Sequence, residues 1–280
     1  MREIAIVGAG ELGGATAYAL ARRNAATTVR LIDERQDVAE GKALDIAQSA
    51  PLNGFATALA GSADIATAGG SEIVILADGA GGGEWQGDEG LKLVERINRF
   101  APAAIILCAG ASQREVVEAG ARNPRIGRER ILGTAPEALA AAARALVALA
   151  VDGSARDVAL SVLGIPPARL VIPWNDATNA GLAVTRLIGE PTRRQLDGRI
   201  AGLWPPGPYA LAAAASKAVE AIGGRSRAIL SCFVAADDST GRRMRAAALP
   251  ARLGSGGVER IVLPTLDVVD RIALDNAMQL

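Results

Sequence analysis

The feature that most constrains the fold is a glycine-rich turn that directly follows an apolar segment at the start of the chain. Residues 3–7 read EIAIV, and Gly8, Gly10 and Gly13 come next with the spacing Gly-x-Gly-x-x-Gly. A helical pattern begins within this turn, and Asp33 ends the next β-like segment about 20 residues further on. Strand, turn, helix and acidic residue in this order are typical of the first βαβ unit of a Rossmann fold.

Each of these residues has a specific use in such a unit. Gly8 makes the tight turn, Gly10 lets a pyrophosphate approach the backbone, and Gly13 lets the helix pack closely against the strand. The first N–H groups of the helix would hold the phosphate. Asp33 would accept hydrogen bonds from the adenosine ribose and repel a 2′-phosphate, which favours NAD over NADP. The alternative is a tight turn with no ligand; the context favours a bound dinucleotide.

The first half of the chain alternates short apolar segments with helical periods. The apolar segments predict strands at residues 3–7, 28–32, 73–76 and 104–107, and the helical periods cover 12–22, 38–48 and 89–100. Strands that are apolar throughout and separated by helices indicate a parallel sheet covered on both faces. We therefore predict a doubly wound α/β domain over residues 1–134.

The second half has a different pattern, which predicts a separate α+β domain over residues 135–280. A long helix is expected to begin at Thr134, with Pro136 in its first turn, a capping box between Thr134 and Glu137, and Gly153 as the left-handed residue after its end. A glycine cluster at 254–257 predicts an antiparallel hairpin. Further strands are predicted at 158–163, 228–234, 245–249 and 258–263, and further helices at 176–187, 209–222 and 266–278.

Charge and cysteine content limit the partners and the compartment. Thirty basic and thirty acidic residues give zero formal net charge, so no general field attracts nucleic acid or anionic lipid. Cys108 and Cys232 lie in apolar segments without metal or disulfide spacing, which predicts no metal site and fits a reducing cytoplasm. Neither a secretory signal nor a membrane-spanning stretch is evident. We expect a soluble cytoplasmic protein with small-molecule partners.

Several segments together resemble the lactate and malate dehydrogenases. The most specific are IAIVGAGELG at 4–13, LID at 31–33 and GKALDIAQSAP at 41–51. Further segments follow in the order and approximate spacing of that family: IVILADG at 73–79, ILGT at 131–134, DVALSVLG at 157–164 and VERIVLP at 258–264. The resemblance covers nearly the whole chain.

This resemblance implies a Rossmann domain followed by a catalytic α/β domain, with NAD(H) as cofactor and a small 2-oxo or 2-hydroxy acid as possible substrate. It also implies a homodimer or homotetramer whose contact includes the helix around residues 41–50. The predicted cofactor-binding residues are Gly8, Gly10, Glu11, Leu12, Gly13, Asp33, Ala77 and Gly79.

The chain departs from this family at the residues that carry its chemistry. In the family a histidine moves the hydroxyl proton while hydride passes between the nicotinamide and the substrate, and this sequence contains no histidine. The family's Gly-Glu-His-Gly-Asp aligns with GIPPA at 164–168, and its Asp-Ser-Ala-Arg, which includes the carboxylate-binding arginine, aligns with PEAL at 136–139. The arginine of its mobile loop is absent from 79–85, and its Thr-Asn-Pro becomes CAG at 108–110.

Two functional hypotheses follow. The preferred one is an NAD-binding protein in which the standard dehydrogenation is lost, a cofactor-binding relic or sensor. The alternative is an NAD-dependent oxidoreductase that acts on a malate- or lactate-like acid, or on another substrate, with a base other than histidine. Candidate catalytic groups for the alternative are Asp78, Glu84 and Asp176, with Asp88, Asn175 and Cys108 as further polar groups near the expected nicotinamide region.

Each of these candidates also has a structural interpretation, as a loop acid, a helix cap or a buried strand cysteine, and we prefer that interpretation. The alternative would further require an arginine that reaches the cleft, from Arg122, Arg125, Arg128 or Arg130. The glycine-rich residues 79–83 suit a flexible lid or an anion-binding loop. We slightly prefer a loop that no longer holds a catalytic arginine.

Overall fold

The computed structural model describes residues 1–237 and 243–279. Six parallel strands in the neighbour order β3-β2-β1-β4-β5-β6 form the sheet of the N-terminal half. This order is that of the Rossmann fold, which confirms the predicted fold class. The strands are β1 (Glu3–Val7), β2 (Thr28–Ile32), β3 (Ala58–Ser62), β4 (Ile73–Leu76), β5 (Ile105–Cys108) and β6 (Ile131–Gly133).

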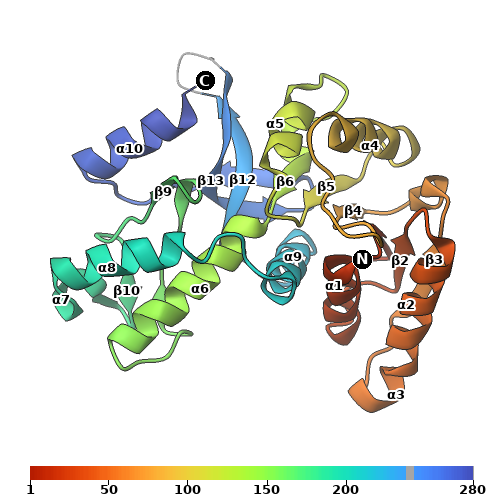
Figure 1. Cartoon of the computed structure of the whole chain (residues 1–280), viewed down its shortest axis with the longest axis horizontal. Helices are drawn as coiled ribbons and strands as arrows, with labels where there is room; N and C mark the ends of the chain where they lie inside the picture. Colours follow the sequence, from red (N-terminus) through yellow and green to blue (C-terminus); the bar gives the residue numbers. More distant parts are fainter. Residues whose placement is uncertain (238–242, 280) are drawn as a thin grey trace.

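Helices cover both faces of this sheet because its strands are apolar on both sides (Figure 1). Ile4 and Ile6 of β1 face α1, whereas Ala5 and Val7 face α4 and α5. The connecting elements are α1 (Glu11–Arg22), α2 (Gln36–Gln48), α3 (Ala50–Asn53), η1 (Ile65–Ala68), α4 (Gly87–Phe100), α5 (Arg114–Arg122) and η2 (Arg128–Arg130).

The second half continues the same sheet with antiparallel strands. Phe233 of β12 (Ile229–Asp237) pairs with Gly133 of β6, and β13 (Arg243–Gly254) lies beyond β12. β8 (Leu163–Ile165), β9 (Arg169–Val171) and β14 (Gly257–Ile261) complete the sheet. Gly254 pairs with Gly257, as predicted for the glycine-rich hairpin. The main helices of this half are α6 (Ala135–Ala150), α8 (Glu190–Ala201), α9 (Pro208–Ile222) and α10 (Val268–Met278).

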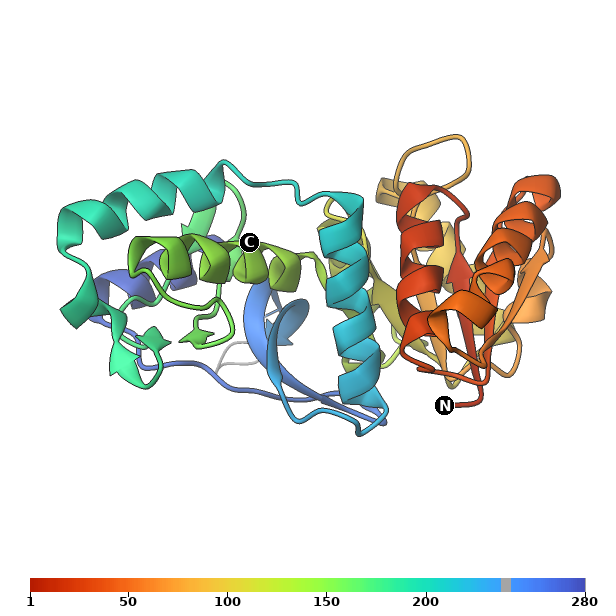
Figure 2. The same ribbon diagram turned by 90° about the horizontal axis from the view of Figure 1, so that it is seen from below.

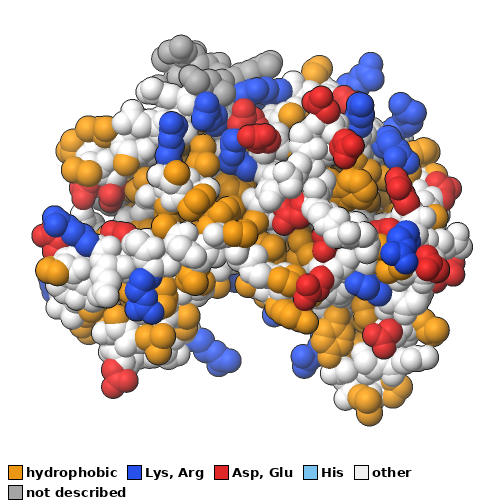
Figure 3. All heavy atoms as spheres, in the orientation of Figure 1, with side chains coloured by type: hydrophobic (Ala, Val, Ile, Leu, Met, Phe, Trp, Pro, Cys, Tyr) orange, Lys and Arg blue, Asp and Glu red, His pale blue; other side chains and the backbone are white. Residues whose placement is uncertain are grey.

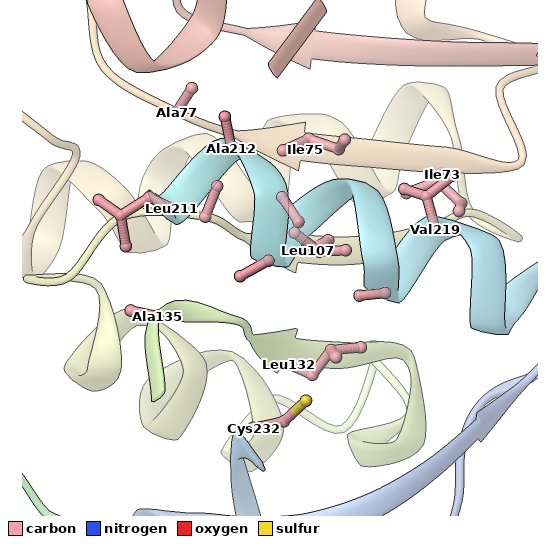
Figure 4. Close-up of a cluster of buried hydrophobic side chains, with 14 of the residues drawn as sticks. Ile73, Ile75, Ala77, Leu107, Leu132, Ala135, Leu211, Ala212, Val219 and Cys232 are labelled. Carbon is pink, nitrogen blue, oxygen red and sulfur yellow. The ribbon is translucent and has the colours of Figure 1, made fainter. Parts of the chain in front are cut away.

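Helix α9 joins the cores of the two halves. It runs beside α1 in Figure 2. In Figure 4 it lies over the sheet, and its Leu211, Ala212 and Val219 belong to one apolar cluster with Ile75 and Leu107. The alanines on the buried side of α9 allow this close approach, because their short side chains let the helix backbone come near the backbone of the sheet. The two halves therefore share one continuous apolar core. No helix in the described residues is long and apolar enough to cross a membrane.

The predicted helix at 176–187 is wrong. β10 (Thr178–Asn179) and β11 (Leu182–Ala183) form a hairpin there, together with β7 (Val158–Ala159), and only α7 (Val184–Leu187) is helical. Ala180 and Gly181 turn this hairpin with φ of 48° and 82°, a conformation that ends any helix. The predicted strand at 158–163 is divided between β7 and β8, and α8 was not predicted.

Both ends of α6 also differ from expectation. Thr134 occupies the N-cap position but makes no side-chain cap bond, and Glu137 forms no capping box because its carboxylate binds buried partners elsewhere. At the other end, Asp152 and not Gly153 adopts a positive φ, of 50°. The N–H of Gly153 still satisfies the carbonyl of Ala148, at 2.8 Å, as in a Schellman-type end.

Candidate functional site

The glycine turn after β1 has the predicted geometry. Gly8 has a φ of 107°, and a Cβ atom on Gly13 would lie 2.0 Å from the carbonyl oxygen of Gly8. The turn therefore requires glycine at both positions to bring α1 against β1. Leu12 is buried in the core behind the turn and Glu11 is exposed. Lys42 of α2 lies beside it and donates from Nζ to the carbonyl oxygen of Gly10 at 2.5 Å.

Asp33 follows β2 and is 8% exposed, next to this turn. Its Oδ2 accepts the backbone N–H groups of Ala9 at 2.8 Å and Ala80 at 2.9 Å, and its Oδ1 accepts that of Arg35 at 3.0 Å. The acid is thus where the sequence predicts a ribose-binding carboxylate. Three N–H groups of its own chain already satisfy it.

Asp78 lies two residues after the end of β4, and its side chain reaches the start of α1. Its Oδ1 accepts the N–H of Gly13 at 2.9 Å, and its Oδ2 accepts that of Leu12 at 3.3 Å. A Cβ atom on Gly10 would lie 2.3 Å from the Asp78 carboxyl carbon. The carboxylate therefore fills the space that the absent Gly10 side chain leaves, and it binds N–H groups that face a phosphate in a Rossmann site.

Residues 79–83 form a short turn between Asp78 and Glu84, which face each other as an antiparallel bridge. Gly79 donates its N–H to Gly83 at 3.1 Å, and Gly82 and Gly83 have φ of 83° and 97°. In Figure 2 the segment after β4 arches at the edge of the sheet where α1 begins. Ala77, in contrast, is fully buried beneath the turn.

Glu84 binds the start of the connection after β5. Its Oε1 accepts the N–H of Ala111 at 3.0 Å, and its Oε2 accepts that of Ser112 at 2.6 Å. A Cβ atom on Gly110 would lie 2.3 Å from the Glu84 carboxyl carbon, so only glycine admits the acid there. Burial and the nearby Glu84 charge raise the pKa of Cys108 to about 12, so this thiol is neutral at physiological pH and is no nucleophile.

Sequence reasoning missed Gln113 at this edge of the sheet. Gln113 is fully buried and joins the ends of β4 and β5: its Nε2 donates to the carbonyl of Ala77 at 3.1 Å and its Oε1 accepts the N–H of Gly110 at 2.9 Å. Trp85 lines a pocket together with Asp33, and its indole N–H is buried without a hydrogen-bond partner among the described residues. The strand order β1-β4-β5 was the available signal, since it brings the residues after these strands together.

A pocket of about 440 Å³ lies beside Asp33, between the carboxyl ends of β1 and β2 and helix α4. The walls are Ile32, Ile65, Leu93 and the Trp85 ring, and the rim carries Asp33, Glu34, Glu89, Lys92 and Arg96. In a Rossmann site the acid that follows β2 binds the adenosine ribose, so the adenosine lies beside that acid. The structure thus leaves space at the adenosine end of the site.

The second half of the chain faces the end of β5 with apolar groups. A pocket of about 210 Å³ lies between Ser112, Arg114, Pro166, Trp204 and Phe233. Trp204 and Phe233 pack edge to face, with ring centroids 5.9 Å apart. Pro166 stands in the segment where the resemblance predicts a histidine. Arg114 was not predicted, and it is held by Glu118 at 2.8 Å and Glu115 at 3.1 Å.

The residues that align with the family's carboxylate clamp are buried in the second half. Leu139 is fully buried in the apolar core. Glu137 is 3% exposed; its Oε1 lies 2.7 Å from Arg144 and 2.9 Å from Lys217, and its Oε2 accepts the N–H of Ser231 at 3.0 Å. These bonds occupy Glu137 fully, so it stabilises the fold and is not available to a substrate.

The other candidates lie apart from the glycine turn. Asp88 is exposed in the first turn of α4. Asn175 donates to Asp267 at 3.2 Å, and Asp176 lines a different pocket, with Arg156 and Lys217. Of the candidate catalytic carboxylates, the structure therefore brings Asp78 to the glycine turn and Glu84 to the neighbouring connection after β5, and it leaves Asp176 elsewhere.

The arginines before β6 lie at the opposite edge of the sheet. Arg122 ends α5, and η2 (Arg128–Arg130) comes just before the amino end of β6. Arg130 donates to the carbonyls of Pro102 and Ala104, which precede β5. The carboxyl ends of the strands carry the site in such sheets. The suggestion that one of these arginines reaches the cleft is therefore wrong for Arg122 and Arg130.

Comparisons with known proteins agree with this architecture. Residues 2–107 match the family described as lactate/malate dehydrogenase, NAD binding domain. The chain is 30% identical over 299 residues to the malate dehydrogenase of Xanthobacter autotrophicus, with 99% of this chain and 93% of that protein covered. The chain belongs to the lactate and malate dehydrogenase family. The malate dehydrogenase of Chlorobium phaeobacteroides is 27% identical over 290 residues, with 97% and 94% covered.

Solved structures of this family have the same fold. The malate dehydrogenase of Salinibacter ruber matches with a TM-score of 0.83 and 25% identity over 98% of this chain and 93% of that one. A lactate dehydrogenase of Cryptosporidium parvum, solved with lactic acid and nicotinamide adenine dinucleotide, matches with a TM-score of 0.87 and 22% identity, covering 99% and 94%. The family match confirms NAD as the predicted cofactor, and the glycine turn and Asp33 fit that group.

Proposed function

We propose that this family member binds NAD and has lost the 2-hydroxy acid dehydrogenation of its relatives. The observation that carries the proposal is the complete absence of histidine from the sequence. Imidazole is suited to move the hydroxyl proton because its pKa lies near neutral pH. Pro166, Trp204 and Phe233 surround the pocket beside Ser112, and Leu139 stands where the carboxylate-binding arginine aligns. Neither a proton carrier of that kind nor the aligned clamp is available.

In this proposal residues 1–134 form the cofactor domain and residues 135–280 the substrate-type domain. The residues that would hold NAD are Gly8, Gly10, Glu11, Leu12, Gly13, Asp33, Ala77 and Gly79. The N–H groups at the start of α1 would bind the pyrophosphate, and Asp33 the adenosine ribose. When bound, NAD supplies a hydride acceptor.

We propose a cytoplasmic homodimer or homotetramer. Leu44 of α2 and Leu52 of α3 are 60% and 90% exposed, and they lie in or beside the helix region expected at the subunit contact. Exposed leucines in such a place support an interface. On the face shown in Figure 3, basic and acidic side chains are interspersed, which agrees with small-molecule partners.

The second candidate is an active NAD-dependent dehydrogenase of a malate- or lactate-like acid. It is favoured by the likeness to proteins named malate dehydrogenase over nearly the whole chain. Arg114, at the pocket between the two halves, is the cation that would have to bind the substrate carboxylate in this case. A carboxylate such as Glu84 would have to move the proton.

Calorimetric titration with NAD and NADH, followed by an NADH-oxidation assay on the same sample, separates the two candidates. The substrates to offer are oxaloacetate, pyruvate and other 2-oxo acids. Binding without turnover supports the proposal, and turnover supports the second candidate. If turnover occurs, Arg114→Leu should abolish it, while Arg194→Leu, on the exposed surface of α8, serves as the control. Failure to bind either nucleotide would overturn both candidates.

A further inference from the structure

Three acidic side chains satisfy the N–H groups along the edge of the sheet where the cofactor is expected. Asp33 accepts from Ala9, Arg35 and Ala80; Asp78 accepts from Leu12 and Gly13; Glu84 accepts from Ala111 and Ser112. Asp78 and Glu84 belong to one short segment, residues 78–84, whose two ends pair with each other. One segment of the chain thus covers the starts of both α1 and α5.

The place that Asp78 occupies is the one a pyrophosphate needs. Its carboxylate lies against Gly10, the glycine that leaves room for phosphate, and it accepts bonds from the first turn of α1 at 2.9 and 3.3 Å. A carboxylate and a phosphate are both anions, and each needs these N–H groups as donors. The two groups cannot share the site, because the space beside Gly10 admits one of them and their charges repel.

We infer that Asp78 is an internal competitor of the dinucleotide, so that NAD binds only when the segment 78–84 moves away from α1. This inference rests on the proposed NAD binding and adds its regulation. Ala80 belongs to the same segment, so the movement also breaks the bond from Ala80 N–H to Asp33. The arrangement is an autoinhibitory contact within the cofactor site.

The adenosine end of the site is open in the same state. The pocket of about 440 Å³ beside Asp33 is bounded by Trp85 and lies outside the Asp78 contact. A ligand that ends at the ribose therefore fits without displacing Asp78, whereas one that carries a pyrophosphate does not. Binding of the pyrophosphate part of NAD therefore requires Asp78 to move, and binding of the adenosine part does not. Substitution of Asp78 should change the affinity for pyrophosphate-containing ligands and leave the affinity for adenosine almost unchanged.

The experiment measures the dissociation constants of adenosine, ADP-ribose and NAD by calorimetry for the full chain and its variants. Asp78→Asn keeps the size of the side chain and removes its charge, and Asp78→Ala removes the group. We expect both to bind ADP-ribose and NAD at least tenfold more tightly than the unmodified protein, with adenosine changed less than twofold. Asp88→Asn, an identical chemical change at the exposed start of α4, should alter none of the three affinities.

A second measurement uses the unmodified protein and does not depend on a variant that folds. Hydrogen exchange at the N–H groups of Ala80 and Gly82, which donate to Asp33 and Gly79, should accelerate on saturation with ADP-ribose and stay unchanged with adenosine.

Equal ADP-ribose affinity in the unmodified protein and both Asp78 variants would overturn the inference and leave NAD binding intact. Unchanged exchange at Ala80 in saturating ADP-ribose would overturn it too. If no variant binds ADP-ribose or NAD, the proposed function fails together with the inference.

Discussion

Substitution of Glu137 by Gln tests whether this acid serves the fold. The change keeps the side-chain volume and one acceptor oxygen, but it removes a charge that is 3% exposed and lies 2.7 Å from Arg144 and 2.9 Å from Lys217. Breaking a buried ion pair by removing one partner costs about 3–5 kcal/mol. Since the Lys217 and Arg144 side chains are 41% and 18% exposed, both can regain some hydration. We therefore expect a loss of about 3 kcal/mol.

For a chain of 280 residues, with an unfolding entropy of about 2.1 cal/mol/K per residue, such a loss lowers the melting temperature by roughly 5 °C. Guanidinium titration followed by circular dichroism gives the free energy of unfolding. The matched control is Glu190→Gln, where the carboxylate pairs with Arg194 at 2.5 Å but is 62% exposed. An exposed pair contributes about 0.2–1 kcal/mol. If the two variants lose similar free energies, the assignment of Glu137 to a buried stabilising cluster is refuted.

Three further changes test other parts of the structure. Gly13→Ala should lower the free energy of unfolding by about 2 kcal/mol or more, because its Cβ would lie 2.0 Å from the Gly8 carbonyl oxygen. The control is Gly198→Ala in α8, where a Cβ meets open space, and it should raise the free energy of unfolding by up to about 1 kcal/mol in the same denaturation assay. Cys108 and Cys232, buried with raised thiol pKa values, should resist a thiol reagent at pH 8 in the native protein and react in guanidinium; rapid native labelling would contradict this. Burial, followed by the charges of Asp267 and Asp197, raises the pKa of Asp270 in the folded protein. Because the unfolded state then loses this proton more readily than the folded state, the free energy of unfolding falls as pH rises above the unfolded pKa of about 3.9. Asp270→Asn should therefore melt higher than the unmodified protein at pH 7 and equal to it near pH 4, and an equal difference at both values would contradict this.

Much of the N-terminal half could be predicted from the sequence because its signals are local. β1, β2 and β4 have the predicted bounds, since each is a short, mostly apolar run that is followed within two residues by a glycine or an acid. β3 escaped prediction because ALAGS is short and has Leu59 as its one large apolar residue. Its Gly61 is required by contact with α2, where a Cβ would lie 2.3 Å from the backbone nitrogen of Glu40, and such a contact between distant segments leaves no periodic pattern.

In the second half, local patterns competed with tertiary contacts. The run at 176–187 has helix-compatible residues, but the turn at Ala180 and Gly181 and the pairing of β10 with β7 give a hairpin. Glu137 has the spacing of a capping box, yet Arg144, Lys217 and Ser231 bind its carboxylate. Lys217 and Ser231 come from α9 and β12, so a local window of sequence around Glu137 contains Arg144 but not the other two partners.

At the cofactor site, a glycine can be required either by the packing of the fold or by a ligand. Gly8 and Gly13 are required by the fold, since a Cβ on either would meet backbone atoms at 2.3 and 2.0 Å. Gly10 differs, because the three atoms nearest to a Cβ there all belong to the Asp78 carboxyl group, at the end of a side chain. Gly8 and Gly13 therefore indicate that α1 packs on β1. Of the three glycines, Gly10 alone reports on the group that occupies the space at the start of α1. Because that neighbour is a carboxylate from the chain itself, the state of Asp78, and not the presence of the glycines, determines whether a pyrophosphate can bind.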